Sequence, residues 1–461
     1  MKLFFPDLDR KSSVPLYIQL YEYIRREIES GGFKPCERMP SSRSLAKHLN
    51  LSKNTVDSAY HLLKTDNLII SAERSGFFAA PDSFHPKYTT ETDPNAVYLY
   101  NFSIHGTDIS RIPYNKWNKA VSDLCFADPL LLDHGSRTGD FSFRTAISEF
   151  LRETSGISCS PHNIVLGAGL EYLLQILDKL LGRENIWGFE NPGYLNHYEI
   201  LNNGAGSVRL LDIASDGFNP SELESSDIKT LYLIPEHQIP TGRFIPLRRR
   251  REILHWAGSS SERYIIENGY DALLKYGREN TPSLFSLDKN GSVIYINSFS
   301  RIIAPSVRLA FMILPDELLE RFKTQNRFYR CLVSRHDQAV VTELIKSGLL
   351  TSYISTARNL YKEKRELAVS FLQNSPIASR IKIFNSGGGT HFLLSVSSAL
   401  SAEKLREKAA EKKIKILPLR HYMIKENCLF PENTFVLGFG GLSKTRLADA
   451  LGLLIEAWSD C

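Results

Sequence analysis

The sequence predicts an α/β fold for most of the chain, preceded by a small, mainly helical N-terminal part. From Tyr98 onward, short apolar runs alternate with longer segments of helical spacing, a pattern typical of a mostly parallel sheet with helices on its faces. Before that point, short helical segments are followed by two short strands. With 461 residues and 43% hydrophobic content, the chain can bury more than one core. We therefore expect at least two domains.

The N-terminal part contains a predicted helix-turn-helix. A helix over 17–30 ends at two glycines, and Ser42–Leu49 has the i, i+3, i+4 spacing of a second, short helix. After a break at 50–51, Ser52 is a good N-cap for a third helix with an apolar stripe over 56–63. Two short helices across a tight turn make a helix-turn-helix.

Two short strands after the helices predict a wing. The segments 68–70 and 76–79 flank a polar turn, and a hairpin there would place Arg74 against a DNA backbone. The second helix of such a motif enters the major groove by its first turn, where Lys53, Asn54 and Thr55 stand. The alternative is an ordinary helical pair with a solvated polar face, which a helix-turn-helix pattern alone does not exclude.

Charge and cysteine content agree with an intracellular DNA-binding protein. The net charge is +5, and residues 1–80 carry 12 Lys and Arg against 9 Asp and Glu. This basic excess suits DNA but is small. The six cysteines show no metal-binding or CxxC spacing, so we expect reduced thiols. We also expect a cytoplasmic protein, since no signal peptide or apolar run of membrane-spanning length is present.

Composition sets the expected domain limits. Residues 81–97 are polar, proline-punctuated and without periodicity, as in a linker, so we expect a DNA-binding domain at 1–80 and a large domain at 98–461. The large domain contains five predicted buried strands: 164–166, 186–189, 230–234, 263–266 and 293–296. A ligand site is expected beyond the carboxyl ends of such strands.

Motifs that can bind an anion follow several of these strands. Gly167-Ala168-Gly169 precedes a helix and could present N–H groups to a phosphate, although such glycines more often mark a tight turn. Ser298, Ser300, Arg301 and Arg308 would form an anion cup of two hydroxyls and two guanidinium groups. The alternative, which we weight almost equally, is that both arginines form internal ion pairs.

Other candidates have structural as well as functional interpretations. His237 follows the strand at 230–234 and could serve a ligand or simply hold a turn. The run 248–251 consists of four arginines and could contact DNA, but a charge run at the start of a helix is usually solvated. The three glycines at 387–389 are expected to allow close backbone approach.

The N-terminal part resembles a known family. The stretch PLYIQLYEYIRREIESGGFKPCERMPSSRSLAKHLNLSKNTVDSAYHLL is similar to the DNA-binding domain of GntR-type bacterial repressors. The resemblance implies DNA contacts by Arg43 and by Lys53, Asn54 and Thr55. Ser42 and the wing residue Arg74 complete the expected set of DNA contacts. Many members have arginine where this chain has Lys53, and lysine loses bidentate recognition of guanine.

The rest of the chain resembles the MocR-type regulators, which join a GntR-type reader to an aminotransferase-like domain of fold type I that binds pyridoxal phosphate. The resemblance rests on SRTGDFSFRTAISEFLRETSGISCSP, GAGLEYLLQIL, ENPGY, PEHQIPTG, IIENGYDALLKY and SFSRIIAPSVRLAFMILP, in family order. It implies a head-to-tail homodimer. It also implies a degenerate cofactor pocket formed by Ala168, Gly169, Tyr194, His237, Asn268, Tyr270, Ser298, Ser300, Arg301 and Arg308.

Three departures from the family pattern affect the pocket. Arg301 stands where the family has the lysine that forms a Schiff base with the cofactor, and a guanidinium cannot form that imine stably. Asn268 replaces the aspartate that pairs with the pyridine nitrogen. Val436 stands where relatives often have an arginine for a substrate carboxylate. We interpret the catalytic centre as decayed and the fold as retained.

We therefore predict a transcription regulator that binds double-stranded operator DNA as a homodimer and has no transaminase activity. No metal and no covalent cofactor are expected, while non-covalent binding of pyridoxal phosphate or another small anionic effector stays open. One alternative is an aminotransferase, or a regulator that responds to pyridoxal phosphate; another is a protein-interaction scaffold with residual DNA affinity.

Overall fold

The protein, represented by a computed structural model, divides into two compact units, Met1–Val97 and Tyr98–Cys461. The structure describes residues 8–9, 12, 14–29, 33, 37–65, 68–72, 76–79, 98–108, 117, 119–122, 129–213, 217–276, 281–328, 330–426 and 429–459. The expected linker at 81–97 lies outside these ranges.

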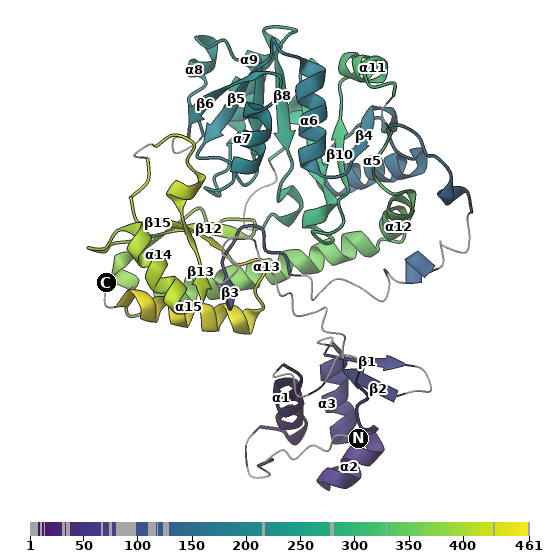
Figure 1. The fold of residues 1–461 in the computed structure, drawn as a ribbon, viewed down its shortest axis with the longest axis vertical. Helices are drawn as coiled ribbons and strands as arrows, with labels where there is room; N and C mark the ends of the chain where they lie inside the picture. Colours follow the sequence, from purple (N-terminus) through teal and green to yellow (C-terminus); the bar gives the residue numbers. More distant parts are fainter. Residues whose placement is uncertain are drawn as a thin grey trace. The chain divides into compact units, whose positions relative to one another are not determined.

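The N-terminal unit has the expected helices followed by a two-stranded hairpin. Its elements are α1 (Leu16–Glu29), α2 (Ser42–Leu49), α3 (Lys53–Thr65), β1 (Ile69–Ala72) and β2 (Gly76–Ala79), shown in Figure 1. The strands are antiparallel, with Ala72 opposite Gly76. The second helix ends at Asn50, which adopts a left-handed conformation with φ 51°, and Ser52 accepts a hydrogen bond from Thr55 N at 3.1 Å. The predicted N-cap of α3 is therefore confirmed.

An apolar core holds α3 against α1 and α2. Leu20, Leu45, Val56 and Leu63 are almost completely buried in it, at the helical spacing that the sequence shows. Tyr60 adds a buried hydrogen bond from its hydroxyl to the Pro40 carbonyl at 2.9 Å. This contact fixes the chain just before α2 relative to α3, which is the geometry that a helix-turn-helix requires.

The large unit is built on a seven-stranded sheet of order β4-β10-β9-β8-β7-β5-β6 (Figure 1). Its strands are β4 (Ile164–Gly167), β5 (Ile186–Asn191), β6 (Ser207–Asp212), β7 (Thr230–Leu233), β8 (Tyr264–Asn268), β9 (Val293–Ser298) and β10 (Ala310–Ile313). Only β10 runs antiparallel to its neighbours. The expectation of a mostly parallel sheet is confirmed.

Helices cover both faces of this sheet. They are α5 (Phe141–Ser155), α6 (Leu170–Leu181), α7 (Leu195–Asn202), α8 (Ser221–Glu224), α9 (Leu247–Gly258), α10 (Leu284–Leu287), α11 (Asp316–Gln325) and α12 (Arg335–Lys346). Successive strand residues reach opposite layers: Ile265 packs in the cluster that contains α9, and Ile266 in the cluster that contains α6. Because both faces are buried, inner strands such as β7 and β9 are mainly apolar, whereas the edge strand β6 is partly exposed and carries Arg209.

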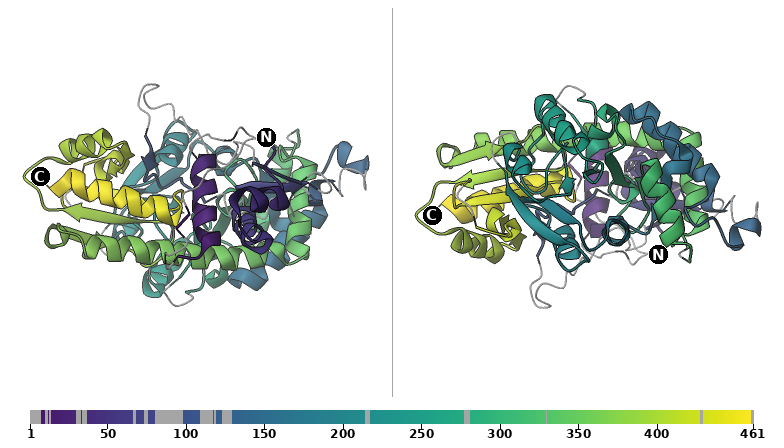
Figure 2. Two further views of the ribbon diagram at one scale, coloured as in Figure 1. Left: turned by 90° about the horizontal axis from the view of Figure 1, so that it is seen from below. Right: turned by 90° about the horizontal axis from the view of Figure 1, so that it is seen from above.

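After the seven-stranded sheet, the chain forms a second part of the large unit. It contains the four-stranded sheet β11-β12-β15-β14, formed by β11 (Ile381–Phe384), β12 (His391–Val396), β14 (Leu417–Pro418) and β15 (Thr434–Gly438). The short strands β3 (Tyr100–Asn101) and β13 (Ile414–Lys415) pair in parallel. Helices α13 (Leu349–Gln373), α14 (Ala402–Glu411) and α15 (Lys444–Ser459) pack on this part, and α13 and α15 lie side by side in Figures 1 and 2.

A buried ion pair anchors the start of the large unit. Lys364 in α13 is fully buried, and its Nζ lies 2.5 Å from Asp108 Oδ2 and 3.2 Å from the Gly440 carbonyl. The pair connects the segment 98–108 to α13. Removing either partner would leave an uncompensated buried charge.

Within the described residues, no helix combines the length and apolarity needed to cross a bilayer. Cys159 and Cys331 are free thiols. The remaining cysteines lie outside the described ranges.

Candidate functional site

The first turn of α3 presents two exposed polar side chains, Lys53 and Asn54. Lys53 is 55% exposed, and its Nζ lies 3.5 Å from Asp57 Oδ2 one turn later. A surface pair of this length holds the ammonium weakly and leaves it available to a phosphate. Thr55 is half-buried, and its hydroxyl lies 2.8 Å from Ser52 Oγ. Thr55 therefore serves the helix cap, and Lys53 and Asn54 are the more accessible residues.

Two of the predicted DNA contacts lie in the first turn of α2 and differ in their exposure. Arg43 is exposed, but Ser42 is only 8% exposed because the first turn of α2 packs into the core. The Ser42 side chain is therefore much less accessible than that of Arg43, and its contact with DNA stays a prediction. Its neighbour Ser41 is exposed instead, and the Ser41 hydroxyl caps α2 by accepting a hydrogen bond from Ser44 N at 3.2 Å. Arg74 lies outside the described residues.

The predicted pocket residues of the large unit gather at one edge of the seven-stranded sheet. The carboxyl ends of β4, β7, β8 and β9 meet there, followed in the chain by Gly169, His237, Tyr270 and Arg301. Since β10 runs in the opposite direction, Arg308 enters the same edge just before that strand begins. The topology thus brings together residues that are far apart in the sequence.

The helix N-terminus at this edge faces a carboxylate of its own chain. Gly169 caps α6 with φ 102°, and a Cβ there would lie 2.3 Å from Arg308 Nη2. Arg308 Nη2 in turn lies 2.5 Å from Glu171 Oε2. Burial alone would raise the pKa of Glu171, but a backbone hydrogen bond and Arg308 lower it. Ala168 lies half-buried beside this turn.

Sequence reasoning missed Glu171, although its position in the first turn of a helix after Gly-Ala-Gly was a usable signal. Acidic residues are stabilised at helix N-termini, as phosphates are. A carboxylate at that position competes for the same N–H groups and the same guanidinium. The structure therefore shows the internal ion pair that was one of the two interpretations of Arg308.

The two serines of the expected cup are engaged within the chain. Ser298 Oγ donates to the Leu309 carbonyl at 3.3 Å and accepts from Ser300 N at 3.1 Å. The Ser300 hydroxyl donates to the Val307 carbonyl in a short hydrogen bond. These contacts fold the turn after β9 back onto the segment before β10, so both hydroxyls have a structural role here.

Arg301 is held by five groups just beyond the carboxyl end of β9. Its Nε lies 3.1 Å from Asp271 Oδ1, and its Nη1 donates to the Gly106 carbonyl at 3.0 Å. Further contacts reach the hydroxyls of Thr107 and Thr390, and the guanidinium stacks over a ring at 5.1 Å, that of Tyr270. The Arg301 side chain is thus fixed in one position and keeps its charge.

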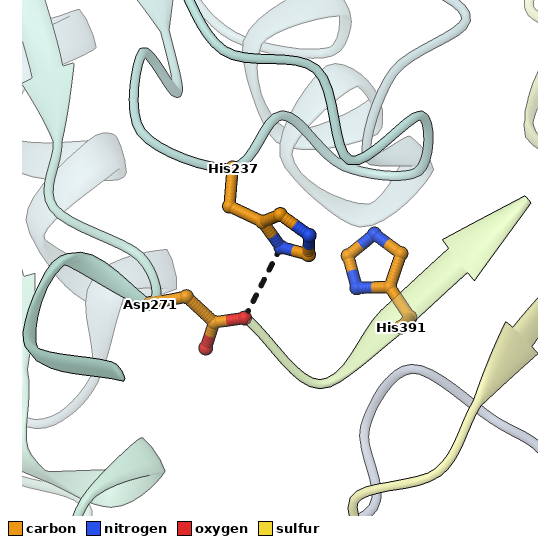
Figure 3. A group of neighbouring side chains, drawn as sticks. All are labelled: His237, Asp271 and His391. Carbon is orange, nitrogen blue, oxygen red and sulfur yellow. Dashed lines mark ion pairs between the residues drawn. The ribbon is translucent and has the colours of Figure 1, made fainter. Parts of the chain in front are cut away.

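Asp271 joins Arg301 to two buried histidines (Figure 3). Its Oδ2 lies 3.3 Å from His237 Nδ1, and the rings of His237 and His391 are 4.3 Å apart between centroids. Burial would raise the pKa of the Asp271 carboxyl, but Arg301 and His237 lower it. Burial and the neighbouring His237 lower the pKa of His391 well below its usual value. Sequence reasoning singled out His237 alone among these three.

Asn268, which was expected to face a pyridine nitrogen, is hydrogen-bonded to a tyrosine. Asn268 Nδ2 donates to Tyr232 Oη at 2.7 Å, and that hydroxyl lies 2.6 Å from His197 Nδ1. Burial lowers the pKa of His197 to about 4, so the ring is neutral at pH 7. Tyr194 meets the His197 ring edge-on, with centroids 4.5 Å apart.

These contacts decide which mode of cofactor binding the residues fit. Covalent attachment of pyridoxal phosphate does not fit, since the only side chain at the attachment position is a guanidinium in an ion pair. The phosphate site is also compromised, because Glu171 already binds Arg308.

One arginine of the run at the start of α9 has a structural role. Arg250 is fully buried and its Nη1 lies 3.0 Å from Glu236 Oε1, while Lys275 holds the other oxygen of that carboxylate at 2.7 Å. The expectation of a solvated run is wrong for Arg250. This residue fixes the loop that carries His237.

Comparison with known proteins finds a matching family for the N-terminal unit and a matching fold for the large unit. Residues 16–79 match the model of the gntR family of bacterial regulatory proteins. The large unit has the fold of an aminotransferase: an archaeal alanine:glyoxylate aminotransferase superposes with a TM-score of 0.72 at 20% identity, covering 79% of this chain and 91% of that chain. The class defined by these two parts is a helix-turn-helix transcription regulator with an aminotransferase-like domain of fold type I.

Relatives that match almost the whole chain identify the family within this class. The uncharacterized HTH-type transcriptional regulator YdeL of Bacillus subtilis is 31% identical over 98% of this chain and 99% of its own length. The probable rhizopine catabolism regulatory protein MocR of Rhizobium meliloti is 25% identical over 98% and 95%. This chain belongs to the GntR family of transcription regulators, in its MocR-type subfamily.

Proposed function

We propose that this DNA-binding regulator acts as a homodimer in the cytoplasm and that its aminotransferase-like unit performs no transamination. The observation that carries the second part is the environment of Arg301. Its guanidinium contacts Asp271, Gly106 and Thr390 where an imine-forming amine would be needed. A guanidinium stays protonated at ordinary pH and is not a nucleophile for an aldehyde.

The dimer is proposed on two grounds. A single winged helix reads too few base pairs for useful specificity, and two-fold symmetry doubles the site. The resemblance to MocR-type regulators implies a head-to-tail arrangement. Sedimentation of the full chain tests this proposal, and a monomer at the concentration that binds operator DNA would contradict it.

A small anionic effector is proposed to bind without a covalent bond, with pyridoxal phosphate as the candidate that the resemblance implies. Arg308 is the cation that such a ligand would use, and it is half-exposed. The ligand must displace Glu171 from Arg308 before its phosphate can enter. We therefore expect weak binding.

An absorbance titration with pyridoxal phosphate tests the lack of covalent chemistry. The purified full-length chain should leave the spectrum of the free aldehyde unchanged, and borohydride should fix no cofactor to the protein. A visible imine band that borohydride traps on a lysine peptide would contradict the proposal and favour an aminotransferase or a cofactor-responsive regulator.

DNA binding by the first turn of α3 is tested with two variants altered at opposite ends of this helix. Lys53→Ala combined with Asn54→Ala should weaken binding to the chain's own promoter region. Lys64→Ala removes a lysine from the last turn of the same helix and serves as the control, because that end faces away from the groove in a helix-turn-helix. Equal affinity of both variants would mean that α3 does not read DNA.

A further inference from the structure

Three buried side chains of the large unit converge on one point, and we propose that they form a binding site for a divalent transition-metal ion such as Zn²⁺. They are His237 in the loop after β7, Asp271 after β8, and His391 at the start of β12 (Figure 3). The site is independent of the DNA-binding function proposed above.

The distances between the donor atoms fit a small cation. One donor atom from each residue lies within 4.8 Å of the others. His237 Nδ1 and Asp271 Oδ2 are 3.3 Å apart. Two ligands of a tetrahedral zinc ion, each bound at about 2.0–2.2 Å, lie about 3.4 Å from each other. This pair already has the required separation, and the His391 donor lies within 4.8 Å of both.

The donor atoms lack other partners in the described part of the chain. His237 is 3% exposed and His391 0%, and none of their four ring nitrogens makes a hydrogen bond to a described residue. The described contact of Asp271 Oδ2 is its ion pair with His237 Nδ1, itself one of the three proposed ligands. Buried polar atoms normally have a partner, because burial without one is costly. A bound cation would provide the missing partner to all three residues.

The donor types select the class of metal. Two imidazoles and one carboxylate suit Zn²⁺ and similar transition metals, whereas Mg²⁺ and Ca²⁺ prefer oxygen ligands alone. Three protein ligands leave a fourth position for water or a small ligand. The class of ion follows from this chemistry.

Neighbouring residues keep the donors in place and the space between them open. Arg301 Nε binds Asp271 Oδ1 at 3.1 Å, which leaves the second carboxylate oxygen directed at His237. Gly389 has φ 63°, and a Cβ there would lie 2.2 Å from His237 Nδ1 and 2.7 Å from Asp271 Oδ2. Any larger residue would intrude between two ligands.

The positive charge of Arg301 opposes a second cation nearby, so we expect moderate rather than extreme affinity. The ion would connect loops of the seven-stranded sheet to β12 of the four-stranded sheet. Zinc should therefore stabilise the large unit against heat, because a ligand that binds the native state alone raises its stability.

Metal analysis of the untagged full-length chain tests the site. The protein is stripped with chelator, incubated with Zn²⁺ and desalted; we expect about one zinc per chain. Co²⁺ should give the visible absorption of a low-coordinate site. His391→Gln and Asp271→Asn should each weaken binding by more than roughly tenfold, since even the loss of an outer partner of a ligand costs that much. His255→Gln, which alters an exposed histidine of α9, should leave binding unchanged.

Two results would overturn the proposal. One is a wild-type chain that retains no zinc and gives Co²⁺ only the spectrum of the aqueous ion. The other is equal zinc binding by the wild type and by both ligand variants, since the metal would then lie elsewhere. If one ligand variant fails to fold, the other variant and the wild-type Co²⁺ spectrum still decide.

Discussion

Arg308 Nη2 lies 2.5 Å from Glu171 Oε2, so the guanidinium at the expected phosphate site already binds a carboxylate of the same chain. The carboxylate stands in the first turn of α6, behind Gly169. A phosphate would use this same helix terminus and this same guanidinium. Access of any anion to the pocket therefore depends on whether Glu171 leaves Arg308.

The first prediction follows from this pair. Glu171→Gln removes the competing charge and keeps the size of the side chain, so affinity for inorganic phosphate and for pyridoxal phosphate should rise by roughly tenfold. Isothermal titration of the full chain measures this affinity. Glu320→Gln, which removes an exposed carboxylate from α11, is the control and should have no effect. Unchanged binding by the Glu171 variant would show that Arg308 is not an anion site.

The second prediction concerns the cost of removing Arg301. Arg301→Ala leaves the buried Asp271 carboxylate without its cation, and the free energy of unfolding should fall by about 3 kcal/mol. Combining it with Asp271→Asn should recover part of the loss, because no uncompensated charge then stays buried. Chemical denaturation of the two single variants and the double variant gives the coupling. Strictly additive losses would mean that the two residues do not act as a pair.

The third prediction is a pH dependence of stability from Glu190, at the end of β5. Burial raises the pKa of this carboxyl to about 8 in the folded protein. Between about pH 4.5 and 8 the folded state thus holds a proton that the unfolded state has lost, so this residue makes stability fall as pH rises through that range. Its contribution is fully present below the lower value and lost above the upper one.

Glu190→Gln should therefore be more stable than the wild type at pH 9 and show a weaker decline between pH 5 and 8. Some decline should persist, because burial also raises the pKa of Glu267, to about 7. Denaturant midpoints across the range measure the slope. Glu222→Gln alters an exposed residue of α8 and should keep the wild-type slope. A Glu190 variant with that same slope would contradict the prediction.

The fourth prediction separates the roles of the two exposed residues on α3. If Lys53 contacts a phosphate, Lys53→Ala should lower the slope of log affinity against log salt by about 1 on every sequence. Asn54→Ala should instead reduce discrimination between operator and unrelated DNA and leave the salt slope unchanged. Binding measured at several salt concentrations on both DNAs distinguishes these effects. A changed salt slope for Asn54→Ala alone would reverse the assignments.

The elements of both units could be predicted because each depends on a local pattern. Helical spacing in 42–49 and 53–65, and the apolar runs that became β4, β5, β7, β8 and β9, follow from the periods of helix and strand. The loss of the imine-forming amine is likewise visible in the sequence, because it depends on the identity of one residue, Arg301. These features need no knowledge of what packs against them.

The tertiary structure decided which side chains meet. Glu171 and Arg308 are separated by more than a hundred residues, and His237, Asp271 and His391 come from three separate segments. Ser42 belongs to a predicted contact set, yet the packing of α2 buries it. Local periodicity carries no information about such contacts, because they depend on strand order and on the direction of β10. The sequence by itself thus determined the class of protein and the identity of each candidate side chain, while long-range packing decided which of these side chains meet.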